Sequence, residues 1–163
     1  MIPGTPLSCV LLADRHHGLT EGVRGLLETS FGTVVMVADE ASLLEGAIRL
    51  RPDVAVVDLS LSRSGSLSWL LALRQRCPEL KVIVLSVHDE QSVRRAVMEA
   101  GADAFVLKRA IASDLLNAVD AVRRSRNVEV SSDNSRPAQE PGIHTGFQEA
   151  RMDAKSSSEE WKP

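Results

Sequence analysis

Five short apolar runs, rich in β-branched residues, constrain the fold of this chain more than any other feature. Each run is four to seven residues long, which is the length of a strand rather than of a helix. Four of the five are almost continuously apolar, as is typical of strands that are buried on both faces of a parallel sheet. The sequence therefore predicts five strands, at residues 7–13, 33–38, 53–58, 81–86 and 104–107.

Segments with helical spacing of their apolar residues lie between these runs and after the last one. Each segment carries one apolar stripe, as an amphipathic helix does when it packs on a sheet. The stripes fall within residues 19–27, 43–48, 67–73, 93–100 and 115–122. Glycine or proline precedes each later strand and is expected to end the helix before it. These breakers are Gly32, Pro52, Pro78 and Gly101.

The alternation of strands and helices predicts an α/β fold. Short connections between them imply right-handed crossovers and a doubly wound, flavodoxin-like parallel sheet with helices on both faces. In the common five-stranded version the strand order is 2-1-3-4-5, and the loops after the first and third strands flank the point where the order reverses. We therefore expect five helices around this sheet and a functional site at the carboxyl ends of its strands.

Composition excludes several classes of function. The net charge of −3 gives no electrostatic footprint for nucleic acid or for an anionic membrane. An aromatic content of 3% with no tyrosine argues against base-stacking platforms. The start of the chain lacks the features of a secretory signal, and no stretch reaches transmembrane length. We therefore expect a protein with neither a nucleic-acid nor a membrane partner.

The two cysteines point to a reducing compartment. Cys9 and Cys77 are far apart, and neither belongs to a CxxC motif or to a cluster with histidine. We interpret both as inert packing thiols and expect a cytoplasmic location.

A change of composition divides the chain after Arg126. The chain's 163 residues suffice for one domain of ordinary size, and the part beyond Arg126 has too few apolar residues to form a core. We predict one domain at residues 1–126 and a polar, mostly disordered tail at residues 127–163. A helix-turn-helix output domain is not expected, because it needs about two more helices with apolar faces.

Four polar residues follow or close four of the predicted strands. They are Asp14, Asp58, Ser86 and Lys108. The fold brings the carboxyl ends of all strands to one edge, so these side chains are expected to share a pocket. A carboxylate nucleophile, a second carboxylate, a hydroxyl and an ammonium suit phosphoryl transfer, which depends on positioning and charge neutralisation.

Around these residues the chain resembles the receiver domain of response regulators, over roughly residues 7–124. The likeness is greatest to receivers of the NarL/LuxR-like subfamily, which usually carry a helix-turn-helix output domain. It rests on VLLAD ending at Asp14, RPDVAVVDLS around Asp58, VIVLS ending at Ser86 and AGADAFVLK ending at Lys108.

The resemblance implies a role for each residue. Asp58 would accept a phosphoryl group from a histidine kinase, a phosphotransfer protein or a small phosphodonor, with Mg²⁺ as cofactor. Lys108 would pair with the phosphoryl oxygens. Ser86 and Phe105 would move inward and change the surface of the fourth helix, fifth strand and fifth helix.

Arg15 is the main departure from the family pattern. Relatives usually carry two adjacent acids after the first strand, and here Arg15 follows Asp14. Asp14, Asp58 and the backbone carbonyl of Ser60 would then hold Mg²⁺ weakly, because a hard cation needs several oxygen ligands. Arg15 either contacts Asp58 or a phosphoryl oxygen, or points to solvent.

Other signals do not predict chemistry. His16 and His17 follow Asp14 at a helix start without an evident third metal ligand, so we interpret them as solvated. Asp58 is followed by Leu59 and Ser60, which lacks the D-x-D arrangement of an aspartate-nucleophile phosphatase.

The function expected is that of a single-domain response regulator whose only chemistry is its own phosphorylation and dephosphorylation. Its partners would be a histidine kinase or phosphotransfer protein, a downstream protein and a second copy in a homodimer. The alternative is a pseudo-receiver, an interaction module in which Arg15 prevents phosphorylation. A DNA-binding regulator ranks third.

Overall fold

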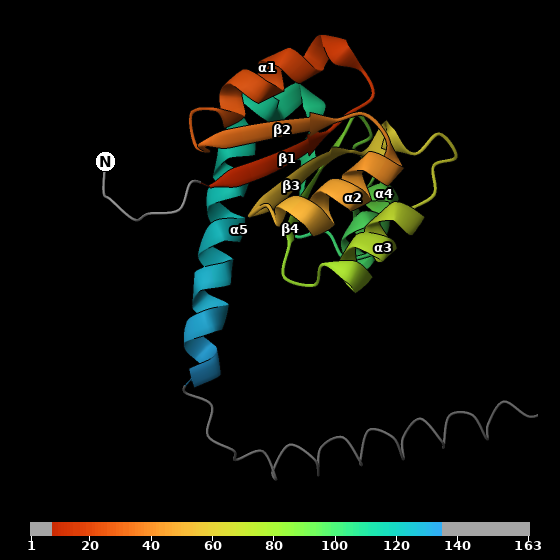
Figure 1. Cartoon of the computed structure of the whole chain (residues 1–163). Helices are drawn as coiled ribbons and strands as arrows, with labels where there is room; N and C mark the ends of the chain where they lie inside the picture. The colour runs from red at the N-terminus through yellow and green to blue at the C-terminus, as the bar shows by residue number, and fades with distance from the viewer. Residues whose placement is uncertain (1–7, 135–163) are drawn as a thin grey trace, which may run out of the picture. The chain divides into compact units, whose positions relative to one another are not determined.

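A single parallel sheet forms the centre of the domain. The computed structural model describes residues 8–134. Its strand order is β2-β1-β3-β4-β5 and every pair is parallel, which confirms the predicted fold class and strand order (Figure 1). The strands are β1 (Cys9–Ala13), β2 (Thr33–Val37), β3 (Val54–Asp58), β4 (Lys81–Ser86) and β5 (Ala104–Leu107).

Helices cover both faces of the sheet, as predicted. In Figure 1, α1 and α5 lie on one face, and α2, α3 and α4 lie on the other. The helices are α1 (His17–Leu27), α2 (Glu40–Leu50), α3 (Ser68–Arg76), α4 (Gln91–Glu99) and α5 (Ile111–Asn134). Two single 3₁₀ turns, Leu59–Leu61 and Lys108–Ala110, follow β3 and β5 directly.

Successive strand residues supply two separate apolar cores. In β1, Leu11 and Ala13 belong to the core beneath α2, α3 and α4, whereas Val10 and Leu12 belong to the core beneath α1 and α5. Every residue of β3 and β4 is buried. Continuous apolar runs thus fit this sheet because both faces of its strands are covered.

Gly101 ends α4 in a conformation that suits only glycine. Its φ is +119°, and a Cβ at this position would lie 2.5 Å from Cγ of Arg74. Arg74 in turn lies beside Asp103, with 3.5 Å between its Nη2 and the Asp103 Oδ2 atom. The predicted helix breaker therefore also makes room for an ion pair between α3 and the start of β5.

The last helix extends beyond the predicted domain boundary. α5 runs to Asn134, past the domain boundary predicted after Arg126. No glycine or proline occurs within α5, so nothing in its sequence forces an earlier end. Within residues 8–134 no helix combines the length and apolar character needed to cross a bilayer. Residues 135–163 of the predicted tail lie outside the described part of the chain.

Two neighbouring leucines of α3 give a direct test of this packing. Leu70 is fully buried, whereas Leu71 is 57% exposed. We expect Leu70→Ala to lower the free energy of unfolding by about 2–5 kcal/mol, because the substitution leaves a cavity in the core. The matched Leu71→Ala change is expected to stay within about 0.5 kcal/mol. Urea denaturation measures both, and equal losses would contradict this placement of α3.

Candidate functional site

The sheet brings the four predicted residues to one edge. Asp14 follows β1 directly, Asp58 and Ser86 are the last residues of β3 and β4, and Lys108 follows β5. The parallel register pairs Asp58 with Leu85, so neighbouring strands end almost level. Asp14, Asp58 and Ser86 are all buried.

Lys108 and Ser60 both contact the Asp58 carboxylate. The Lys108 Nζ donates a hydrogen bond of 2.7 Å to the Asp58 Oδ2 atom. The Ser60 hydroxyl donates to the same oxygen at 2.9 Å, and the Ser60 amide donates to Oδ1 at 3.1 Å. Asp58 is 2% exposed, so its charge is compensated by these donors rather than by bulk water.

The pKa values of the two acids at the site are shifted in opposite directions. Burial alone would raise the pKa of Asp58, but the hydrogen bonds from Lys108 and Ser60 outweigh it and hold that pKa below its usual value. Burial raises the pKa of Asp14, and the nearby Asp58 charge adds to this shift against the opposing hydrogen bond from the His16 amide. Asp58 is thus the better-stabilised anion of the pair.

The side chain of His16 also lies beside these two carboxylates. The sequence did not predict this position. Its Nδ1 atom lies 3.6 Å from the Asp14 Oδ1 atom and 3.7 Å from the Asp58 Oδ2 atom. The three side chains could together hold a metal ion, since their donor atoms all lie within 4.8 Å of one another. The prediction that His16 has no third metal ligand beside it was therefore wrong, whereas its ring is 57% exposed, as expected of a solvated histidine. The available signal was its place two residues after Asp14, in the loop beside the point where the strand order reverses.

Ser86 and Phe105 are both already turned inward. Ser86 is 1% exposed, and its hydroxyl accepts a hydrogen bond of 2.9 Å from the His88 amide. Phe105 is 8% exposed and packs in the core beneath α2, α3 and α4. The guanidinium carbon of Arg94 stands 4.7 Å from the centre of the Phe105 ring, which adds a cation–π contact from α4.

Arg15 and Asp58 line the same cavity. The two side chains form no ion pair in the part of the chain that the structure describes. The Nε atom of Arg15 is buried and has no hydrogen-bond partner there. Arg15, Asp58, Ser86 and Lys108 all contribute to the wall of a cavity of about 600 Å³ that extends over β3 and β4 towards α4. Lys108 therefore neutralises Asp58, and Arg15 adds a second cationic side chain to the wall of the same cavity.

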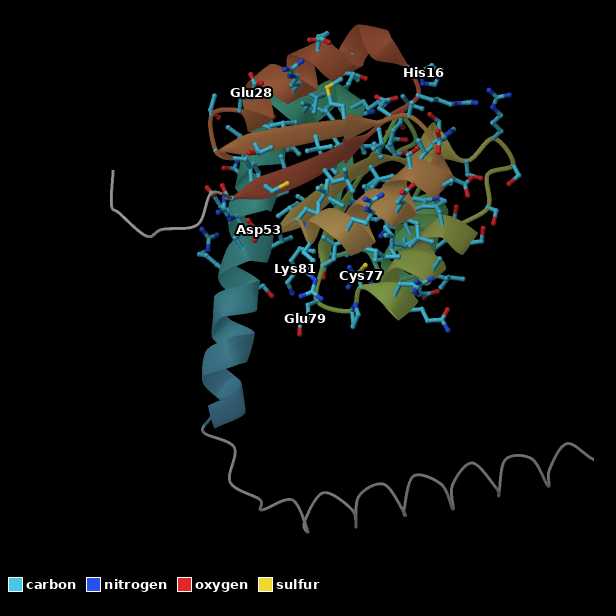
Figure 2. All side chains as sticks on the ribbon, viewed as in Figure 1. His16, Glu28, Asp53, Cys77, Glu79 and Lys81 are labelled. Carbon is cyan, nitrogen blue, oxygen red and sulfur yellow. The ribbon has the colours of Figure 1, made fainter. Side chains whose placement is uncertain are left out.

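The thiols lie away from this edge. Figure 2 shows His16 at the carboxyl end of the sheet and Cys77, with Asp53 and Lys81, at the opposite end. Cys77 packs against the core beneath α2, α3 and α4. Burial, together with the charge of Asp53, raises the pKa of the Cys9 thiol, which keeps it protonated and unreactive.

Asp14 offers a test of the site's electrostatics. A carboxyl whose folded pKa is raised favours the folded state below its unfolded pKa, and this contribution is lost as the pH rises through the folded pKa. We therefore expect Asp14→Asn to increase the free energy of unfolding near neutral pH and to have a smaller effect in acid. Urea denaturation at both pH values measures this, with exposed Asp120→Asn as the control. A loss of stability at neutral pH would contradict it.

An α/β sheet of this order, with two carboxylates, a hydroxyl and a lysine at one edge, defines the class of receiver domains. The chain matches the response regulator receiver domain family over residues 10–120, and it belongs to that family.

Curated relatives agree with this assignment. The chain is 32% identical over 115 residues to the transcriptional regulatory protein DegU of Brevibacillus brevis, covering 69% of this chain and 49% of DegU. It is 35% identical over 130 residues to the nitrate/nitrite response regulator protein NarP of Escherichia coli (strain K12), covering 78% of this chain and 60% of NarP. The chain thus spans about half the length of the curated relatives that it matches.

Solved structures show the same likeness. A LuxR-family response regulator from Aurantimonas sp. SI85-9A1 superposes with a TM-score of 0.67 at 25% identity, covering 90% of this chain and 99% of that one. The isolated receiver domain of RcsB from Salmonella enterica serovar Typhimurium, solved with the phosphomimetic BeF₃⁻, gives 0.65 at 25% identity, covering 73% and 90%. The expected likeness to NarL/LuxR-like receivers is confirmed.

Proposed function

We propose that this receiver domain accepts a phosphoryl group on Asp58 and signals through the conformational change that follows. The observation that carries the proposal is the 2.7 Å bond from Lys108 to a buried Asp58, at the wall of an open cavity. The ionised Asp58 carboxylate is the nucleophile in this proposal. The Lys108 ammonium beside it can balance the negative charge of the phosphoryl group that arrives.

The chemistry needs little beyond these side chains. An Asp58 oxygen attacks phosphorus, the bond to the donor's leaving group breaks, and an acyl phosphate remains on Asp58. Lys108 transfers its hydrogen bond to a phosphoryl oxygen, and the Ser86 hydroxyl turns from the His88 amide to another. Arg15 supplies a third contact, since its buried Nε atom has no partner in the described structure.

Mg²⁺ is the cofactor expected for this family, and the residues fit it only in part. Asp14 and Asp58 provide hard oxygen donors, with the Ser60 carbonyl as a third. Arg15 stands where the family pattern has a second acid, so one oxygen ligand is missing. Lys108 and Ser60 already donate hydrogen bonds to the Asp58 carboxylate. We therefore propose weak Mg²⁺ binding, in which the ion would neutralise charge on the transferred group.

The output would arise at α4, β5 and α5. Phosphorylation replaces the Asp58 carboxylate by an acyl phosphate and so adds about one negative charge to the pocket that Ser86 also lines. The inward position of Ser86 is maintained by the His88 amide. A change there reaches Phe105, and Arg94 over its ring links that change to the surface of α4. The bistable element is the loop between β4 and α4.

The partners follow from this role. A histidine kinase or phosphotransfer protein would dock at the open edge, and a downstream protein or a second copy of the chain would bind the altered surface. RcsB has been solved as dimers on DNA, but we propose protein rather than nucleic acid as the partner of the domain described here. We also propose a cytoplasmic location and a domain that ends near residue 126.

Labelling by a small phosphodonor such as acetyl phosphate tests the proposal. The protein is incubated with Mg²⁺ and the donor, and intact mass spectrometry is expected to find one added phosphoryl group. An unlabelled wild-type protein would instead favour the pseudo-receiver. The observation in favour of that alternative is Arg15 at the position of a metal-binding acid.

A further inference from the structure

Asp14 and Asp58 lie together at this edge, and Asp58 is the one of the two that accepts a hydrogen bond from a cationic side chain in the described structure. Asp14 and Asp58 are 4% and 2% exposed, and Lys108 donates its bond to Asp58. Asp14 accepts its hydrogen bond from a neutral group, the amide of His16. Within the described structure the Asp14 carboxylate therefore lacks a cationic hydrogen-bond donor of its own, and it can serve as a ligand of a divalent cation.

The His16 backbone is held at both ends. Its amide donates to the Asp14 Oδ1 atom at 2.8 Å, and its carbonyl accepts a hydrogen bond from the buried Thr20 hydroxyl. The imidazole is 57% exposed, yet its Nδ1 atom lies within 3.7 Å of both carboxylates. This nitrogen therefore faces the same point as the two acids without a large rearrangement of the loop.

These donors differ in kind from those that Mg²⁺ prefers. Mg²⁺ takes oxygen ligands, whereas one imidazole with two carboxylates suits zinc and its neighbours in the first transition row. Ligand atoms about 2.0–2.2 Å from zinc at tetrahedral angles lie about 3.3–3.6 Å apart. The distances of 3.6 and 3.7 Å from Nδ1 to the carboxylate oxygens are close to that spacing.

We propose that Asp14, His16 and Asp58 form a mixed nitrogen–oxygen site that binds a late first-row divalent cation, represented by Zn²⁺, more tightly than Mg²⁺. The inference deepens the proposed function, because it concerns the cation at the same carboxylates. Arg15 supports it, since loss of an oxygen donor weakens Mg²⁺ most, while His16 supplies a ligand that Mg²⁺ uses poorly.

Calorimetric titration of the whole chain with ZnCl₂ and with MgCl₂ tests this proposal. Zn²⁺ is expected to bind at least about tenfold more tightly than Mg²⁺. His16→Asn should lower the Zn²⁺ affinity by about 10–100-fold and leave the Mg²⁺ affinity unchanged. His17→Asn is the matched control, because His17 is the next residue along the chain and the substitution is identical. Its Zn²⁺ affinity should equal that of the wild type.

Binding to other groups cancels in this comparison. Zinc held by Cys9, Cys77 or any other side chain contributes equally to the wild type and to both histidine variants. Titration with Co²⁺ gives a second readout, since its visible absorption changes when a nitrogen ligand is lost. Equal Zn²⁺ affinities for wild type and His16→Asn, or tighter Mg²⁺ than Zn²⁺ binding, would overturn the proposal.

The two proposals fail separately. Metal affinity is read without a phosphodonor, and labelling of Asp58 is read with Mg²⁺ and no zinc. A protein that is labelled but does not distinguish Zn²⁺ through His16 keeps the proposed function and loses this site. A protein that binds Zn²⁺ through His16 but is never labelled keeps the site and loses the phosphoacceptor role.

Discussion

Asp58→Asn is expected to abolish labelling by a small phosphodonor. The substitution keeps the size of the side chain and an oxygen that can accept from Ser60, but it removes the anionic nucleophile. It also leaves Lys108 without its carboxylate partner. Intact mass spectrometry of wild type and variant, incubated side by side, measures the effect as loss of the added phosphoryl mass.

Asp120→Asn serves as the control, since Asp120 is an exposed acid on α5 and the substitution is chemically identical. It should be labelled like the wild type. Circular dichroism establishes that both variants are folded. Persistent label on Asp58→Asn would place the phosphoryl group on another residue and would remove Asp58 from the proposal.

The strands were predictable because helices cover both faces of the sheet. β4 (Lys81–Ser86) and β5 (Ala104–Leu107) begin and end at the predicted residues, and β3 starts at Val54, one residue later than predicted. Continuous β-branched runs between helical stripes admit few other arrangements.

The site was predictable to the extent that the fold dictates it. Parallel strands place all their carboxyl ends at one edge, so Asp14, Asp58, Ser86 and Lys108 converge whatever the loops do. The bond between Lys108 and Asp58 follows from that topology together with the reach of a lysine side chain. Sequence position alone was therefore enough for these four residues.

The sequence did not predict the geometry of the loop after β1. The loop that carries the His16 ring is held by two hydrogen bonds, one from the His16 amide to Asp14 and one from the Thr20 hydroxyl to the His16 carbonyl, and no periodicity encodes these. The same holds for Arg15, for which contact with Asp58 and exposure to solvent were both open. Its Nε atom is in fact buried and without a partner in the described structure, an outcome that spacing cannot indicate.

The interior position of Phe105 was likewise not evident. The family resemblance implies that Phe105 moves inward on phosphorylation. In this structure, which carries no phosphoryl group, Phe105 is buried with 8% of its surface exposed, and Arg94 lies over its ring. The stacking of Arg94 on this ring pairs residues from α4 and β5, and only the packed structure reveals it. Any switch at this position therefore starts from an inward ring.

Lys108→Met is expected to slow phosphorylation of Asp58 by about 10²–10³-fold, the scale for removing one fixed donor from a group that gains charge in the transition state. Methionine keeps most of the length and apolar surface of lysine, so the change isolates the ammonium group. The rate of labelling by a small phosphodonor, followed by intact mass spectrometry, measures it. Arg109→Met is the control, because Arg109 is the next residue, is exposed and pairs with Asp89 at 3.1 Å.

The same substitution should change how stability depends on pH. The lowered pKa of Asp58 stabilises the folded protein above the unfolded pKa, and this contribution is lost as the pH falls through the folded value. Without Lys108 the pKa of Asp58 rises, so Lys108→Met is expected to be less stable than the wild type near neutral pH and closer to it in acid. Urea denaturation across this range measures the difference. If Lys108→Met and Arg109→Met were equally fast in labelling and equally stable at every pH, the bond between Lys108 and Asp58 would have no energetic role and the proposed phosphoacceptor site would lose its main support.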